Sequence, residues 1–161
     1  MNDTDNEGDL RAAIGPKTEY YLAHWRAMDA AGKARDWNWA ACFANMFWLA
    51  YRKMWRVLGL FVLAFILTAL LGAVVPSLAR PILLLQIGLT FVTGAYGNTV
   101  FRRKIDGLVA QSRNEAGDPA AARAMLAARG GVSVPAVLLL VGLCVVFVVA
   151  SVLAVMVGQG G

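Results

Sequence analysis

Uncharged apolar tracts alternate with polar segments along the chain, and this alternation predicts its architecture. Asp, Glu, Lys and Arg are all absent from residues 57–79, 81–101 and 130–161. A helix of about 20 such residues is long enough to cross the hydrocarbon core of a membrane. The pattern therefore predicts an all-α integral membrane protein with three transmembrane helices.

The first two predicted spans form a hairpin over residues 57–101. Pro76 ends the first span, and Pro81 is suited to the first turn of the second span. The linker between the two prolines is short. We therefore expect the two spans to pack side by side in opposite directions.

Small and polar side chains mark the faces through which these two spans are expected to pack. At about 100° per residue, the members of each set fall on one side of their helix. The positions are Ala64, Thr68 and Gly72 in the first span and Gln86, Thr90, Thr93 and Gly97, followed by Asn98, in the second. One interpretation is hydrogen bonding across the hairpin, worth about 1 kcal/mol or less per contact, and the other is a path for a solute or ion. The polar stripe contains no ionisable residue, which favours packing.

A polar connector at residues 102–133 leads to the third predicted span at residues 134–157, and an uncharged tail follows at residues 158–161. Within the connector, Asp118 is a suitable N-cap, and Pro119 suits the first position of a helix. We therefore expect a short alanine-rich helix there.

Two kinds of polar segment precede the hairpin. Residues 1–16 are acidic and poor in apolar side chains, a composition that predicts a disordered tail. Residues 17–56 carry apolar positions at intervals of three and four, which predict two amphipathic helices in the cytoplasm or at the membrane interface. The first of these helices is expected within residues 17–33.

The second helix, within residues 37–56, is rich in aromatic side chains, and its apolar run is too short to cross a membrane. On a helical wheel its polar side consists of Asn38, Asn45, Arg52 and Arg56, and its apolar side of Ala40, Phe43, Phe47, Ala50 and Met54. This division favours a helix that lies in the membrane interface. A re-entrant hairpin and a straight continuation into the first span are the alternatives.

Aromatic and basic residues close to the spans are the candidate contacts with lipid or with a protein partner. The rings suit the headgroup region, and each cation near an anionic membrane surface contributes about 1 kcal/mol to binding. The candidates are Trp37, Trp39, Phe43, Phe47, Trp48, Tyr51, Arg52, Lys53, Trp55, Arg56, Arg102, Arg103 and Lys104.

Basic residues are distributed very unequally among the predicted segments. Eight Lys and Arg precede the first span, one lies in the hairpin turn, six follow the second span and none lies in the tail. The positive-inside rule therefore predicts a cytoplasmic N-terminus and a periplasmic C-terminus. The net charge of +5 is scattered beside apolar segments, which argues against a nucleic acid as partner.

The chain carries no recognisable catalytic, metal or cofactor motif. Neither GxGxxG nor GxxxxGK[ST] occurs, and Cys42 and Cys144 lack the CxxC spacing. Enzyme chemistry would require residues that are distant in the sequence to converge, namely His24, Asp29, Asp36 or Asp106. We therefore expect no catalytic residue, no metal and no cofactor.

The stretch NWAACFANMFWLAYRKMW at residues 38–55 resembles the signature of a domain-of-unknown-function family of small bacterial inner-membrane proteins. In that signature a W-N-W-A-A block is followed by F-W-x-x-Y-R-K-M. The resemblance extends over roughly residues 17–135 and includes Tyr20-Tyr21, Gly97-Asn98, Phe101-Arg102-Arg103 and Gly130-Gly131. The chain departs from it by carrying Cys42 and Ala44-Asn45 where relatives show phenylalanine and glycine-proline. The resemblance implies the bacterial inner membrane and no particular activity.

Two hypotheses follow for the function. The leading one is a non-enzymatic accessory or scaffold component that docks on anionic lipid or on a larger membrane complex. Its partners would be membrane lipids and either other membrane subunits or further copies of the chain. The alternative is an oligomeric transport or channel component that uses the polar stripe of the second span.

Overall fold

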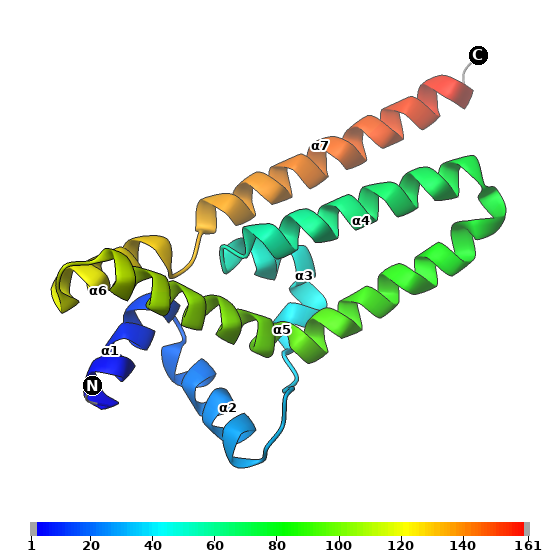
Figure 1. Ribbon diagram of the computed structural model, residues 1–161. Helices are drawn as coiled ribbons and strands as arrows, with labels where there is room; N and C mark the ends of the chain where they lie inside the picture. The colour runs from blue at the N-terminus through cyan, green and yellow to red at the C-terminus, as the bar shows by residue number, and fades with distance from the viewer. Residues whose placement is uncertain (1–2, 160–161) are drawn as a thin grey trace.

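The computed structural model describes residues 3–159, and every regular element in this part of the chain is helical (Figure 1). The elements are α1 (Asp3–Ile14), α2 (Thr18–Ala30), α3 (Trp39–Tyr51), α4 (Trp55–Val74), the 3₁₀ turn η1 (Pro76–Leu78), α5 (Ala79–Glu115), α6 (Pro119–Arg129) and α7 (Val134–Gln159). Three helices, α4, α5 and α7, are long and apolar enough to cross a membrane. The predicted all-α fold is therefore confirmed, together with three helices of the length and composition that the predicted spans require.

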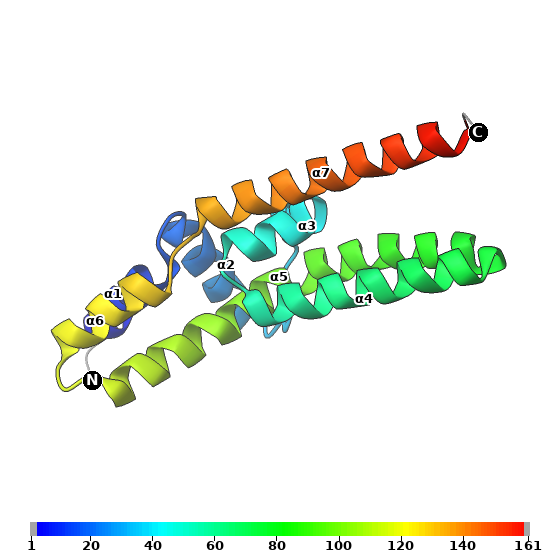
Figure 2. The ribbon, with the colours of Figure 1, turned by 90° about the horizontal axis from the view of Figure 1, so that it is seen from above.

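The long helices extend from one end of the molecule, and the short helices gather at the other. Figures 1 and 2 show α4 and the first half of α5 as a hairpin, with α7 pointing in the same direction as α4. The second half of α5 lies with α1, α2 and α6 at the opposite end. Because no described side chain of α4 or α7 is buried, the apolar helices do not form the core of the structure.

The core lies at the end where the short helices gather. Phe101, Ile105 and Leu126 are fully buried there, and the rings of Tyr21 and Trp48 pack on Phe101 with centroids 4.8 and 6.1 Å away. Side chains from α1, α2, α3, α5 and α6 therefore share one apolar cluster. This cluster fixes the polar helices to the base of the hairpin.

The acidic N-terminal segment is helical, so the prediction of a disordered tail is wrong for residues 3–14. Ala13 and Ile14 at the end of α1 are fully buried. The carboxylate of Asp9 accepts hydrogen bonds from Arg113 at 2.6 Å and from Arg123 at 3.1 Å. These arginines lie more than 100 residues away in the sequence. They supply the positive charge that the acidic segment itself lacks. The first two residues of the predicted tail lie outside the described residues.

The second predicted span does not end at Phe101, because α5 continues through the basic cluster to Glu115. The helix stops only where Ala116 adopts an extended conformation ahead of Gly117. The predicted connector therefore begins as a helix. Its short helix is present as α6, and Asp118 caps it by accepting hydrogen bonds from the amides of Ala120 and Ala121 at 2.8 and 2.9 Å. The predicted C-terminal tail is helical as far as residue 159, and residues 160–161 lie outside the described part of the chain.

The aromatic helix α3 crosses α5 at two glycines. A Cβ atom at Gly97 would lie 2.7 Å from the Cβ of Ala41, and one at Gly94 would lie 2.8 Å from the Cβ of Cys42. No side chain fits in such a gap. The helix also packs against α4 and α7, so it lies between all three long helices.

The helical wheel does not separate the buried from the exposed side of α3, because Ala50 and Met54 of the predicted apolar side are buried together with most of the polar side. Its polar positions face the protein: Asn38, Asn45 and Arg52 are only 1, 8 and 1% exposed. Its outer side carries Trp39 and Phe43, which are 63 and 79% exposed. Two of these polar side chains have partners on other elements, whereas the amide of Asn45 has none among the described residues. The Nδ2 of Asn38, for example, donates to the Oδ1 of Asn98 at 2.7 Å.

Candidate functional site

Four cations line one groove between the start of α4 and the middle of α5. We call this feature the basic groove, and its volume is about 570 Å³. Its lining consists of Lys53, Met54, Trp55, Arg56, Val57, Val100, Arg103, Lys104, Gly107, Leu108 and Gln111. No Asp or Glu belongs to this lining. The groove is therefore cationic with an apolar floor.

A tight turn between α3 and α4 supplies half of the basic groove. Lys53 adopts a left-handed conformation with φ 52°, and the next amide, of Met54, donates to the carbonyl of Leu49 at 2.9 Å. The side chain of Met54 is then buried, while Trp55 is 53% exposed. Arg56 follows in the first turn of α4. This turn places a tryptophan and two cations at the point where the apolar helix begins.

The cations of the basic groove differ in how they are satisfied. The Nζ of Lys104 donates to the carbonyl of Arg52 at 2.6 Å, and the Nζ of Lys53 donates to that of Ala128 at 3.3 Å. Arg56 and Arg103 have no ion pair or hydrogen-bonded side chain among the described residues. Guanidinium groups pair with phosphate and carboxylate through two parallel hydrogen bonds. The two arginines are therefore the groups most available to an external anion.

Two of the six predicted basic contacts point elsewhere. Arg52 was expected to reach anionic headgroups, but it is 1% exposed and donates to the carbonyls of Ile14 and Pro16, each at 3.1 Å. Its guanidinium carbon lies 4.6 Å from the ring centre of Tyr21. Arg52 therefore ties the turn between α1 and α2 to the core. Arg102 forms a bidentate pair with Asp29 at 2.6 and 2.9 Å.

The predicted aromatic contacts divide between the surface and the core. Trp39, Phe43 and Trp55 are exposed, and the rings of Trp39 and Phe43 stack with centroids 5.6 Å apart. Trp37, Phe47 and Tyr51 are partly buried. Trp48 is buried against Phe101, so it cannot reach lipid in this arrangement.

The predicted polar stripe of the second span makes its hydrogen bonds within the protein. The Nε2 of Gln86 donates to the Oγ1 of Thr68 across the hairpin at 3.3 Å. The hydroxyls of Thr90 and Thr93 donate to carbonyls of their own helix at 2.7 and 2.8 Å. These contacts support the packing interpretation of the stripe. At Gly72 in the first span, an added Cβ atom would lie 3.3 Å from Ile82, and Ala64 accepts a hydrogen bond from Thr68 at 2.9 Å.

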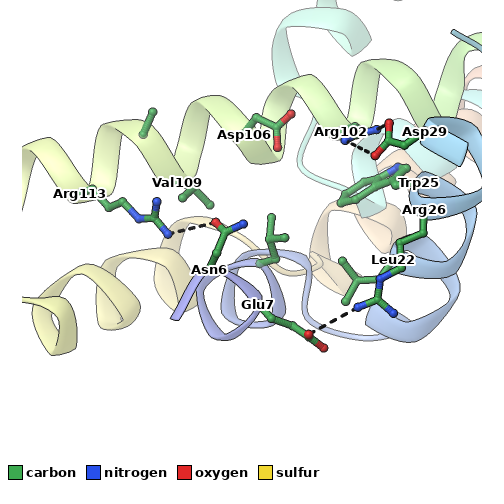
Figure 3. Close-up of a pocket in the computed structure, with 12 residues that line it drawn as sticks. Asn6, Glu7, Leu22, Trp25, Arg26, Asp29, Arg102, Asp106, Val109 and Arg113 are labelled. Atoms are coloured by element: carbon green, nitrogen blue, oxygen red, sulfur yellow. Dashed lines mark hydrogen bonds and ion pairs between the residues drawn. The ribbon is translucent and has the colours of Figure 1, made fainter. Parts of the chain in front are cut away.

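A second charged pocket lies on the other side of α5, between that helix, α1 and α2 (Figure 3). We call it the paired-charge pocket, and its volume is about 460 Å³. Figure 3 shows Arg102 directed at Asp29, Arg26 directed at Glu7, and Arg113 directed at Asn6. The hydrogen bonds from Arg102 hold the pKa of the Asp29 carboxyl below its ordinary value. The charges in this pocket therefore compensate one another.

The residues considered for enzyme chemistry form two separate groups. The Nδ1 of His24 is hydrogen-bonded to the carboxylate of Asp36, and the Nδ2 of Asn98 lies 3.4 Å from the same carboxylate. Asp29 and Asp106 both line the paired-charge pocket. Within residues 3–159, no group of three or more His, Cys, Asp or Glu is arranged to hold a metal ion, and both cysteines are free. His24 and Asp36 are thus brought together, which is one part of the convergence that enzyme chemistry would require.

Comparison with known proteins identifies one matching family and no individual relative or solved structure. Residues 19–106 match the family described as "Protein of unknown function (DUF2628)". Neither the curated proteins nor the solved structures include a match to the chain. The matched segment runs from α2 to the middle of α5 and includes Lys53, Arg56, Arg103 and Lys104 of the basic groove. Because the match covers more than half of the chain, this protein belongs to the DUF2628 family of unknown function.

Proposed function

We propose that this chain is a non-enzymatic membrane protein that acts by interaction, as an accessory or scaffold component. Its basic groove docks on anionic lipid or on an acidic segment of a larger membrane complex. The observation that carries the proposal is the convergence of four cations, from α5, α4 and the turn before α4, on a groove whose lining has no carboxylate. A cationic groove of this kind concentrates anions from its surroundings.

The proposed placement follows the apolar helices. With α4, α5 and α7 across the bilayer, the basic groove lies at the membrane surface, because it includes the first turn of α4. Trp55 suits this level, where tryptophan rings settle between headgroups and acyl chains. The rings of Trp39 and Phe43 on α3 are exposed as well. The charge distribution and the family resemblance favour the bacterial inner membrane, with a cytoplasmic N-terminus and a periplasmic C-terminus.

Lipid phosphate is the ligand best suited to Arg56 and Arg103, which have no partner among residues 3–159. At the surface of an anionic membrane each such cation contributes about 1 kcal/mol, so the pair contributes about 2 kcal/mol, or about 30-fold in affinity. Val57, Val100 and Leu108 supply apolar side chains to the same lining as the cations. A lipid whose phosphate is held at the rim could lay its glycerol and upper acyl chain against these side chains.

The test is a double substitution in the full-length protein, Arg56→Gln with Arg103→Gln. A matched control, Arg26→Gln with Lys33→Gln, removes the same charge from α2 and the loop that follows it, outside the lining of the groove. Purified proteins in a neutral detergent are titrated with a short-chain phosphatidylglycerol and, separately, with a short-chain phosphatidylcholine. We expect the first double variant to bind phosphatidylglycerol about 30-fold more weakly and the control to bind it normally.

Equal losses in both double variants would show that net charge alone sets the affinity, and would contradict a site in the groove. Unchanged binding by the Arg56 and Arg103 variant would also contradict it. Purification in a gentle detergent, followed by identification of bound lipids and proteins, separates the two proposed ligands. An acidic protein that is lost from the double variant alone would identify a complex as the partner.

A further inference from the structure

The lining of the basic groove contains very few side chains that could accept a hydrogen bond. Apart from its four cations, its polar side chains are the amide of Gln111 and the indole of Trp55. The indole only donates, so Gln111 is the one neutral side-chain acceptor in this lining. A sugar or glycerol beyond the phosphate would gain little here, and an amine would be repelled by the cations. The lining therefore suits a headgroup that ends at its phosphate.

The charge of the groove also exceeds that of an ordinary phospholipid headgroup. Lys53, Arg56, Arg103 and Lys104 carry four positive charges, and no carboxylate of the lining offsets them. A phosphodiester carries one negative charge, whereas a phosphomonoester carries about 1.5 to 2 at neutral pH. Opposite charges attract more strongly in a partly desolvated groove than in bulk water. The monoester is therefore the better electrostatic match.

The two arginines approach the groove from different helices. Arg56 lies in the first turn of α4, and Arg103 lies in α5. A guanidinium binds phosphate best through two parallel hydrogen bonds, which occupy two oxygens. A phosphodiester has only two terminal oxygens, but a monoester has three, so each guanidinium can bind a pair of oxygens and share only one. The Nζ of Lys104 donates to the carbonyl of Arg52, and two of its three donors remain for the same phosphate.

The apolar part of the lining indicates that a lipid carries this phosphate. Val57, Val100 and Leu108 share the lining with the cations, and Trp55 beside them is 53% exposed. The helix α4, which begins at Trp55, has no buried side chain. A soluble phosphate compound would contact the cations and leave these apolar groups in water. A lipid would cover them with its acyl chains.

From these observations we propose that the basic groove binds a lipid whose headgroup is a terminal phosphomonoester, as in phosphatidic acid. The two arginines hold the terminal oxygens, and the two lysines add charge. The upper acyl chains lie against the apolar side chains of the lining. This inference rests on the proposed function of the groove as a lipid site, and it narrows that function to one class of headgroup.

The test compares two short-chain lipids that differ by one methyl group, phosphatidic acid and phosphatidylmethanol. The methyl group turns the monoester into a diester, so it removes one negative charge and one terminal oxygen while adding little volume. Each lipid is titrated by calorimetry into the full-length protein in a neutral detergent. We expect the wild type to bind phosphatidic acid about tenfold more tightly than phosphatidylmethanol.

The double variants used above show whether this preference arises in the groove. In Arg56→Gln with Arg103→Gln, the preference should fall to about twofold, because the groups that hold the third oxygen are gone. The matched control, Arg26→Gln with Lys33→Gln, should keep the tenfold preference, since neither residue belongs to the lining.

A pH series on the wild type provides a second measurement, which needs no variant. The charged side chains of the lining are Lys53, Arg56, Arg103 and Lys104, and the buried Arg52 lies behind Lys104. As the pH falls, these groups can only gain protons, which would favour any anion. A phosphomonoester, however, takes up its second proton near pH 6. The preference for phosphatidic acid should therefore shrink to about twofold between about pH 7.5 and about pH 5.

The two proposals fail in different ways. Equal binding of both lipids by the wild type, with both weakened in the Arg56 and Arg103 variant, would keep the groove as a lipid site and overturn the monoester. Unchanged binding of both lipids by that variant would overturn both proposals. A preference that persists in acid would show that the second charge is not recognised. Displacement of phosphatidic acid by an equal concentration of glycerol 3-phosphate would identify a soluble ligand instead of a lipid. If the double variant fails to fold, the methyl comparison and the pH series on the wild type decide the question.

Discussion

The two sides of α5 carry similar basic side chains, but only those on one side are paired with carboxylates. Arg102 and Arg113 face the paired-charge pocket and bind carboxylates of α2 and α1. Arg103 and Lys104 face the basic groove, which has no carboxylate in its lining. At about 100° per residue, the two pairs point to nearly opposite sides of the helix. Consecutive basic residues thus divide between an ion pair within the fold and a groove that has no carboxylate in its lining.

The basic cluster before α4 divides in the same way. Arg52 is buried and holds two carbonyls, whereas its neighbour Lys53 lines the basic groove. In each cluster one arginine is built into the structure and the next cation faces the groove. Substitutions at neighbouring positions should therefore separate stability from binding, and this distinction can be tested.

The largest effect is expected at Arg52. The substitution Arg52→Leu would leave the carbonyls of Ile14 and Pro16 without their donors inside the core. We expect a loss of about 3 kcal/mol in the free energy of unfolding. Chemical unfolding of the detergent-solubilised protein, followed by circular dichroism, measures it. A stability within about 0.5 kcal/mol of wild type would mean that this arginine is not structural.

A substitution of Asp9 tests the ion pairs of this side of α5 by removing the carboxylate instead of the arginine. Its side chain is 8% exposed and accepts hydrogen bonds from Arg113 and Arg123. Asp9→Asn would remove the charge that both arginines share, and we expect a loss of about 2 kcal/mol in the same unfolding experiment. Asp5→Asn is the control, because its side chain is 59% exposed. Exposed pairs contribute about 1 kcal/mol at most.

The comparison is sharpest between the adjacent residues Arg102 and Arg103. Arg103→Gln should leave the unfolding free energy within about 0.5 kcal/mol of wild type and weaken phosphatidylglycerol binding about fivefold. Arg102→Gln should leave that binding unchanged and lower stability slightly. The two variants lose the same charge one residue apart. If both lowered lipid affinity to the same extent, the two sides of α5 would not differ in function.

The smallest expected effect is a dependence on pH. The pKa of Asp29 is lowered from its ordinary value of 3.8 because Arg102 donates hydrogen bonds to the carboxylate. A group with a depressed pKa in the folded state stabilises the fold above its unfolded pKa, and this contribution is lost as pH falls through the folded value. The small stability difference between wild type and Arg102→Gln should therefore be present at neutral pH and vanish in acid. A difference that persists after Asp29 is protonated would assign it to another contact of Arg102.

Local patterns predicted the parts of the fold that depend on local physics. The spans follow from uncharged runs, and the cap at Asp118 follows from a residue type and the proline after it. Those features need no distant partner. The helical wheel for α3 also grouped Asn38, Asn45 and Arg52 correctly, because the grouping depends only on the helical period.

Distant partners explain where the sequence was misleading. The wheel could not show that the polar side of α3 meets Asn98, which lies 60 residues from Asn38. The acidic tail is ordered for the same reason, since its cations come from α5 and α6. The sequence predicted which basic residues are candidates for the site. It could not predict which of them line the basic groove and which are paired with carboxylates or carbonyls. The kink at Asn45 falls at one of the positions where the chain departs from the family resemblance.

Among the described helices, α3 is the one against which α7 packs. The amide of Ser133, just before α7, donates to the carbonyl of Tyr51 at 2.8 Å, at the end of α3. The base of α7 is therefore held by α3 alone among the described helices. A small change in the bend of α3 at Asn45 would rotate α7 and displace its C-terminal end by a larger distance. A pair of spin labels, one near Val157 and one near Leu78, would convert that displacement into a measurable distance.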